Sequence, residues 1–207
     1  MKDDASFWDR IAQRYAKSPV RDEAAYAQTL ARTRARLTDE DHVLEIGCGT
    51  GTTALKLADS VASIVATDAS AQMIDIAQAK LDDHDAGNVR FTRQGLVTGA
   101  FEDAPFDAVL AFNLLHLMDD TEGSVRRIHG LLRPEGLFIS KTVCLADANP
   151  VFRPIVAVLR WFGKAPLVRF LKVSQLEKMI EGAGFEIIET GTYPAKPPSR
   201  FIVARKR

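Results

Sequence analysis

The stretch that decides the fold is Val43-Leu44-Glu45-Ile46-Gly47-Cys48-Gly49-Thr50-Gly51. Its apolar half predicts a buried strand over 42–46, and helical periodicity follows from about residue 52 to residue 59. Glycine at every second position permits positive φ and lets a ligand approach the backbone closely. A strand, a glycine turn and a helix in this order predict a nucleoside-binding site.

Strands and helices alternate along the rest of the chain. Apolar runs predict further strands at 63–67, 88–93, 106–112, 137–143, 185–189 and 201–204. This alternation indicates an α/β fold with a mostly parallel sheet of seven strands, covered by helices on both faces. No helix separates the last two strands, so we expect the seventh strand to pair antiparallel with the sixth. We treat 1–207 as a single domain.

Local signals predict two helix starts. Ser70 is expected to cap a helix whose inner face carries Met73. Ser174 with Glu177 reads as a capping box at the start of a later helix.

The composition narrows the function classes. The chain holds 27 Lys and Arg against 27 Asp and Glu, whereas a nucleic-acid-binding protein usually has a basic excess or a basic face. We therefore expect no nucleic-acid partner. Cys48 and Cys144 are too few for a disulfide scaffold. The low cysteine count, the charged amino terminus and the lack of a long apolar run together indicate a cytoplasmic protein without a transmembrane segment.

Two carboxylates, Asp68 and Glu45, bear on which kind of nucleoside the site can bind. Asp68 ends the second predicted strand, where a carboxylate can accept hydrogen bonds from both hydroxyls of a ribose. No Gly-Lys-Ser/Thr follows Gly51 and position 52 is Thr, so neither the phosphate-binding loop nor the dinucleotide pattern is present. Glu45 would repel a pyrophosphate but suits a cationic ligand. Glu45 is thus compatible with a cationic ligand that carries an ammonium group and a sulfonium.

Glu-x-Gly-x-Gly-x-Gly followed by Asp68 resembles the class I S-adenosylmethionine-dependent methyltransferases. The resemblance continues through 64–80, 106–117, 132–138 and 183–185, which are similar to later strands and turns of that family. The segment 7–15 resembles the lid helix of the small-molecule branch that includes the ubiquinone/menaquinone methyltransferases. The resemblance implies a Rossmann-like three-layer sandwich and S-adenosyl-L-methionine as the cofactor.

The resemblance also implies a set of cofactor-binding residues: Tyr15, Glu45, Gly47, Gly49, Gly51, Asp68, Ala69, Met73 and Asn113. The glycines would lie beneath the methionine and ribose parts, Glu45 would orient the ammonium, and Asp68 would hold the ribose. Ala69 and Met73 would flank the adenine, while Asn113 and Tyr15 would reach the methionine end. The chain departs from the family after the third strand, where Gln94-Gly95-Leu96 stands in place of an acidic residue that binds the adenine amine.

The sequence offers one candidate catalytic residue and no set of metal ligands. His116 follows the fourth strand and is the candidate general base, but local packing is the favoured interpretation. His42, His84, Asp85 and His129 lack the spacing of metal ligands, so we predict no metal.

Two segments are expected to cover the acceptor: the lid helices within 1–37 and an apolar, basic insert at 145–172. The predicted function is in-line methyl transfer to a small acceptor that is apolar or anionic. The alternatives are a non-catalytic S-adenosylmethionine-binding regulator or pseudoenzyme, and another use of the fold such as a decarboxylative transfer. For the insert, a homodimer surface and a shallow membrane-contacting helix remain rival interpretations.

Overall fold

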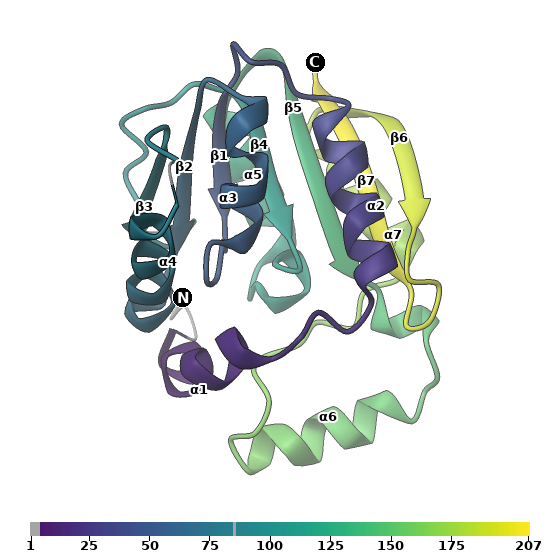
Figure 1. Cartoon of the computed structure of the whole chain (residues 1–207). Coiled ribbons are helices and arrows are strands. Elements are labelled where there is room, and N and C mark those ends of the chain that lie inside the picture. The colour runs from purple at the N-terminus through teal and green to yellow at the C-terminus, as the bar shows by residue number, and fades with distance from the viewer. Residues whose placement is uncertain (1–4, 85) are drawn as a thin grey trace.

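The computed structural model describes residues 5–84 and 86–207 and shows a central sheet between two layers of helices (Figure 1). The sheet has seven strands in the order β3-β2-β1-β4-β5-β7-β6. The strands are β1 (His42–Ile46), β2 (Ser63–Asp68), β3 (Val89–Arg93), β4 (Phe106–Phe112), β5 (Leu132–Val143), β6 (Phe185–Thr192) and β7 (Ser199–Lys206). The predicted three-layer α/β fold is confirmed.

The first five strands pair in parallel, and β7 pairs antiparallel with both β5 and β6. The predicted antiparallel pairing of the last two strands is therefore confirmed. The order reverses at β1, whose neighbours are β2 and β4. At such a reversal the connections leave toward opposite faces, and a crevice opens at the carboxyl ends of the strands.

Helices cover both faces of the sheet. The helices are α1 (Ala5–Lys17), α2 (Glu23–Arg34), α3 (Thr52–Leu57), α4 (Ala71–Asp82), α5 (Thr121–Leu131), α6 (Phe152–Trp161) and α7 (Val173–Gly182). Short 3-10 turns lie at η1 (Ala58–Ser60), η2 (Leu115–Leu117) and η3 (Leu145–Asp147).

Two buried clusters form the core, one on each face. Alternation along β1 sends Val43 into the cluster that packs on α2, α3 and α4, and Leu44 into the cluster that packs on α5 and α7. In Figure 1, α1 lies below the arrowheads of the parallel strands, and α6 lies below α1. The helix α1 thus lies next to the strand ends where the crevice opens, and α6 lies farther out on the same side.

Two local predictions were wrong. The predicted capping box of Ser174 and Glu177 does not form, because Ser174 lies inside α7. The side chain of Gln175 accepts the amide of Lys172 (3.0 Å), and Asp147 accepts the amide of Val173 (2.7 Å), so an aspartate from a distant part of the chain caps this helix.

The fifth strand was predicted to begin at residue 137, but β5 begins at Leu132. The register of its pairing with β4 shifts between Phe106 and Ala108, which accommodates the extra residues. Glu135 has φ 63° within this irregular part. Because this part of the strand lacks regular alternation, sequence periodicity predicts a turn there and not a strand.

Candidate functional site

The turn between β1 and α3 is built from three glycines with left-handed backbone. Gly47, Gly49 and Gly51 have φ of 69°, 54° and 76°, a region in which residues with a Cβ are strained. A Cβ on Gly51 would lie 2.5 Å from Phe91 Cζ, and one on Gly47 would lie 2.8 Å from Leu114 Cδ1. These two glycines are required by protein packing.

Gly49 differs from its neighbours. A Cβ there would meet no atom nearer than Tyr15 Cε1, at 3.9 Å. The backbone at Gly49 therefore borders free space, with the ring of Tyr15 on the far side. This is a cradle that a ligand can fill.

Asp68 closes one side of this space. Its Oδ2 accepts the amide of Gly49 (2.9 Å), and its Oδ1 accepts the amide of Ser70 (2.9 Å). Burial raises the pKa of this carboxyl above its ordinary value, the two amides oppose that rise, and the carboxylate of Asp9 adds to it. Asp68 is thus fixed in direction by the turn that it faces.

Glu45 is a buried carboxyl beneath the same turn. Its residue surface is only 2% exposed, and its Oε2 has no hydrogen-bond partner. Burial, together with the nearby charge of Asp68, raises its pKa to about 8. A buried acceptor without a partner is unfavourable unless a ligand supplies a donor. A cationic group at this point would satisfy Glu45 and hold it ionised.

The helix α1 is fastened over the cradle by Asp9. Asp9 Oδ1 accepts the hydroxyl of Ser70 (2.6 Å) and the amide of Gln72 (3.1 Å), at the start of α4. Ser70 Oγ in turn accepts the amide of Met73, which confirms the predicted cap. The position of α1 above the strand ends is therefore specified by polar contacts and not by apolar burial alone.

Two tyrosines line the same region. Tyr15, on α1, is half exposed, and partial burial together with the charge of Asp68 raises its pKa. Tyr26, on α2, donates to or accepts from Thr53 Oγ1 (3.2 Å), and burial raises its pKa, with smaller contributions from Glu45 and Tyr15. The structure thus brings Tyr15, Tyr26, Glu45 and Asp68 together.

The other sequence-predicted residues lie at the rim or in the core. Met73 is buried, and Ala69 is partly buried directly after β2. Asn113 is exposed after β4 in a left-handed conformation (φ 55°), and its amide donates to Lys141 O (2.7 Å). Its neighbour Leu114 packs against Gly47, so the loop after β4 borders the turn.

A depression of about 340 Å³ lies where the sequence departs from the resembled family. It is lined by Ala5, Ala69, Arg93, Gln94, Gly95, Thr98 and Gly99. Gln94 Nε2 donates to Ala100 O (2.9 Å), which orders the loop after β3. The depression adjoins Asp68 through Ala69 and offers polar groups in place of a carboxylate.

His116 lies in η2 and is buried. Its Nδ1 has no partner, and burial lowers its pKa to about 4. A histidine in this environment is neutral at physiological pH and is a weak proton acceptor. Its backbone oxygen accepts the amide of Arg169 (2.7 Å), which ties the insert to the loop after β4.

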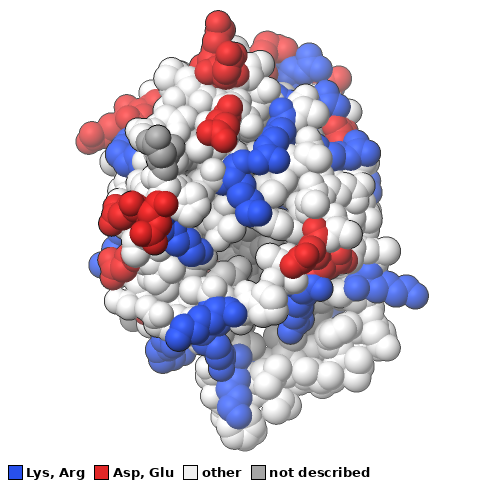
Figure 2. Space-filling view, viewed as in Figure 1, with Lys and Arg blue, Asp and Glu red and all other residues white. Residues whose placement is uncertain are grey.

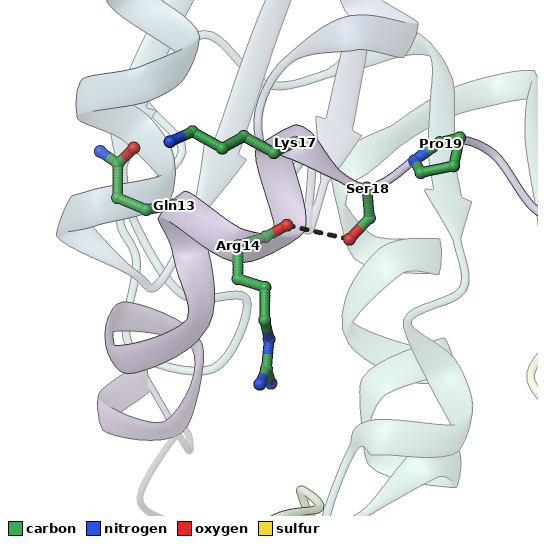
Figure 3. Close-up of a pocket in the computed structure, with 5 residues that line it drawn as sticks. All are labelled: Gln13, Arg14, Lys17, Ser18 and Pro19. Atoms are coloured by element: carbon green, nitrogen blue, oxygen red, sulfur yellow. Dashed lines mark hydrogen bonds between the residues drawn. The ribbon is translucent and has the colours of Figure 1, made fainter.

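An open groove of about 530 Å³ lies at the carboxyl end of α1 (Figure 3). Gln13, Arg14, Lys17, Ser18 and Pro19 line it. Ser18 Oγ donates to Arg14 O (2.9 Å), and the side chain of Arg14 points away from the strand ends. The groove is thus a feature of the end of α1, and two of its lining side chains, Arg14 and Lys17, are cationic.

Sequence reasoning missed Asp9, Tyr26 and Lys80 as site residues. Lys80 Nζ donates to Thr50 O (2.9 Å), Thr50 Oγ1 (3.0 Å) and Thr52 Oγ1 (2.9 Å), and so anchors the glycine turn from α4. These contacts join residues far apart in the chain, so no local sequence pattern predicts them.

Basic side chains on the face seen in Figure 2 are interspersed with acidic ones. Arg32 and Arg36 pair with Glu189, and Arg34 donates to Lys56 O.

Within residues 5–84 and 86–207, no group of three His, Cys, Asp or Glu side chains gathers as metal ligands. Asp85, which was considered as a ligand, lies outside the described residues, and so do the first four residues of the predicted lid. None of the helices described is both long and apolar enough to cross a bilayer.

Comparisons with known proteins agree with this geometry. A family profile described as "Methyltransferase domain" matches residues 43–136, from β1 into β5. The chain is 28% identical to O-methyltransferase resE of Aspergillus sclerotiorum, over 84% of this chain and 68% of the relative. It is also 28% identical to demethylmenaquinone methyltransferase of Leptospira interrogans, over 72% of this chain and 68% of the relative.

Other relatives named as methyltransferases are matched over about half of their own length (49% and 46%). Among solved structures, the CcbJ methyltransferase from Streptomyces caelestis superposes with a TM-score of 0.76. At 20% identity, over 99% of each chain, this likeness concerns the fold.

Proposed function

We propose that this chain is a class I S-adenosylmethionine-dependent methyltransferase that transfers the methyl group of S-adenosyl-L-methionine to a small acceptor. The observation that carries the proposal is the pair of carboxyls at one glycine turn. Asp68 is held by the turn itself, and the buried Glu45 has an Oε2 without a hydrogen-bond partner. One suits a ribose and the other suits an ammonium group.

The residues present fit this cofactor. Asp68 binds the ribose, Gly49 allows the close approach, and Glu45 orients the ammonium. Tyr15 closes the site from α1, and Tyr26 lies near Glu45 on the other side. Gly47 and Gly51 shape the turn, and Asn113 contributes its carbonyl at the methionine end. Ala69 and Met73 flank the adenine, which extends toward the depression beside Gln94.

When bound, the cofactor supplies a methyl group that its sulfonium has already made electrophilic. The chain contributes positioning and the exclusion of water, which can account for about 7–11 kcal/mol of the barrier. Asp9 holds α1 over the strand ends and so keeps water from the reacting atoms. We infer that His116 does not act as the general base, because its pKa of about 4 leaves little affinity for a proton.

We place the acceptor below the strand ends, between α1 and the insert at 145–172. Arg14 and Lys17 in the groove favour an anionic acceptor, and the apolar residues of the insert favour an apolar one. The names of the relatives, an O-methyltransferase and a demethylmenaquinone methyltransferase, support a small-molecule acceptor. We keep a cytoplasmic location as a prediction.

The test of the function is the appearance of S-adenosylhomocysteine when the protein is incubated with cofactor and a cell extract. Asp68→Ala should abolish both cofactor binding and product formation. His116→Asn should keep turnover within about threefold and leave its pH profile unchanged, whereas loss of about 100-fold would make His116 catalytic. Binding without turnover in any extract fraction would instead favour a regulator or pseudoenzyme.

The proposed acceptor cover has its own test. Removing residues 150–167 should abolish turnover while cofactor binding, measured by calorimetry, stays intact. Loss of both would mean that the insert supports the fold.

A further inference from the structure

The helix α6 presents an apolar face that no other part of the described chain covers. It contains no buried residue. Val151, Ile155, Val158 and Leu159 follow one another at helical spacing and are all exposed. Trp161 and Phe162 extend this face at 86% and 67% exposure, with ring centroids 5.8 Å apart. Single exposed apolar residues are common, but a contiguous set on one helix marks a contact surface.

The charge of the surrounding segment is one-sided. Residues 148–172 hold five basic residues and no Asp or Glu, although the whole chain balances 27 basic against 27 acidic residues. The basic residues are Arg153, Arg160, Lys164, Arg169 and Lys172. In Figure 2 the lower end of the molecule, where Figure 1 places α6, shows uncharged and basic atoms and no acidic ones. The partner of this segment must therefore be anionic and apolar.

The segment is held to the body at its base. Ala146 N donates to Leu171 O (3.1 Å), and the guanidinium of Arg153 lies 5.0 Å from the ring centroid of Phe170. Arg169 contacts the backbone of His116 and of Asp119. The helix is thus presented at a fixed place beyond the strand ends, below α1 (Figure 1).

We propose that α6 binds the surface of an anionic lipid bilayer. An amphipathic helix with basic residues and exposed aromatic residues lies in the interface, with its apolar face at the acyl boundary. A second copy of this chain is a poorer partner, because two segments with five positive charges each would repel one another. With α6 on the bilayer, the groove of Arg14 and Lys17 and the carboxyl edge of the sheet lie on the membrane side.

The test is sedimentation of the full chain with vesicles of phosphatidylcholine, with and without phosphatidylglycerol. We expect at least ~tenfold tighter binding to the anionic vesicles, weakened by added salt. Trp161→Ser with Phe162→Ser should weaken binding about tenfold or more, and Arg160→Gln with Lys164→Gln should reduce the preference for anionic lipid, because two of the five positive charges are lost. Val20→Ser and Arg126→Gln, which change exposed residues elsewhere, are the matched controls.

A spectroscopic arm locates the contact. In a Trp8→Phe background, Trp161 is the remaining tryptophan, and its emission should shift to shorter wavelength on anionic vesicles. Circular dichroism and binding of S-adenosylhomocysteine establish that each variant is folded and that its cofactor site is intact, so failure here is separate from failure of the proposed function. Equal binding by the Trp161→Ser/Phe162→Ser variant and the controls would overturn the proposal. So would a concentration-dependent dimer that the same variant abolishes.

Discussion

At the scale of single residues, Glu45 is the least ordinary group in the chain. The residue is 2% exposed and its Oε2 has no hydrogen-bond partner, so ionising its carboxyl costs folding free energy, a cost that the amide of Ala54 offsets only in part. Asp68, by contrast, accepts two backbone amides, which offset part of the rise in its pKa that burial causes. We therefore expect the protonation of Glu45 to change when a cationic ligand binds, whereas Asp68 is already oriented by the amides of Gly49 and Ser70.

The pH dependence of Glu45 gives a first prediction. Its folded pKa of about 8 lies above the ordinary 4.5, so its contribution to stability is full below pH 4.5 and is lost as pH rises to about 8. Well above pH 8, the free energy of unfolding of Glu45→Gln should exceed that of the parent protein by on the order of 2 kcal/mol. Urea unfolding of both proteins measures this difference.

Cofactor binding should show the opposite preference, because an ammonium favours ionised Glu45. The affinity of the parent for S-adenosylmethionine should rise with pH up to about 8, and that of Glu45→Gln should be lower and flatter. When the cofactor binds to the parent protein, Glu45 should release its proton, whereas Glu45→Gln has no such proton to release. Calorimetry in buffers of different ionisation enthalpy measures this proton release. Equal proton release from both proteins would refute this role of Glu45.

Two glycines of the turn form a matched pair. Gly51→Ala places a Cβ 2.5 Å from Phe91 Cζ and should cost about 2–4 kcal/mol of unfolding free energy. Gly49→Ala meets only the backbone strain, about 1–2 kcal/mol, yet should lose cofactor binding because its Cβ enters the cradle. Urea unfolding and calorimetry measure the two effects. Normal binding by Gly49→Ala would place the cofactor elsewhere.

At the scale of elements, α1 is the part whose position matters most to the site. The only side chains it buries are those of Phe7 and Ala12, so the contacts of Asp9 at the start of α4 carry much of its docking. An element with few buried side chains opens more readily than the core.

Removing the Asp9 contact should therefore uncouple activity from stability. Asp9→Ala loses bonds to Ser70 and Gln72 and should lower turnover about tenfold, with a change in unfolding free energy of only about 1 kcal/mol. Hydrogen exchange of the α1 amides should become faster. Asp75→Ala, an exposed carboxylate on the same α4, is the control and should change neither quantity.

At the scale of the whole molecule, the proposed cofactor site joins the carboxyl ends of β1 and β2 to α1, α2 and α4. A ligand there binds the folded chain and not the unfolded chain, so it stabilises the entire fold by mass action. At about 100 times its dissociation constant, S-adenosylhomocysteine should add about 2.7 kcal/mol and raise the Tm by about 5–10 °C. Asp68→Ala should show no such shift, and a shift of equal size in that variant would contradict the site.

Sequence patterns were enough to predict the strand, the glycine turn and the helix at 42–59, the α/β alternation, and the carboxylate of Asp68. These are local features, because the period of a strand or helix and the φ of a glycine are set by neighbouring residues. Three features became visible only in the folded chain: Asp9 and Lys80 hold α1 and the glycine turn in place, Tyr26 lies near Glu45, and Asp147 caps α7. The tertiary structure also decided the protonation of Glu45 and the exposure of α6, since burial and electrostatic contacts depend on residues that meet only when the chain folds.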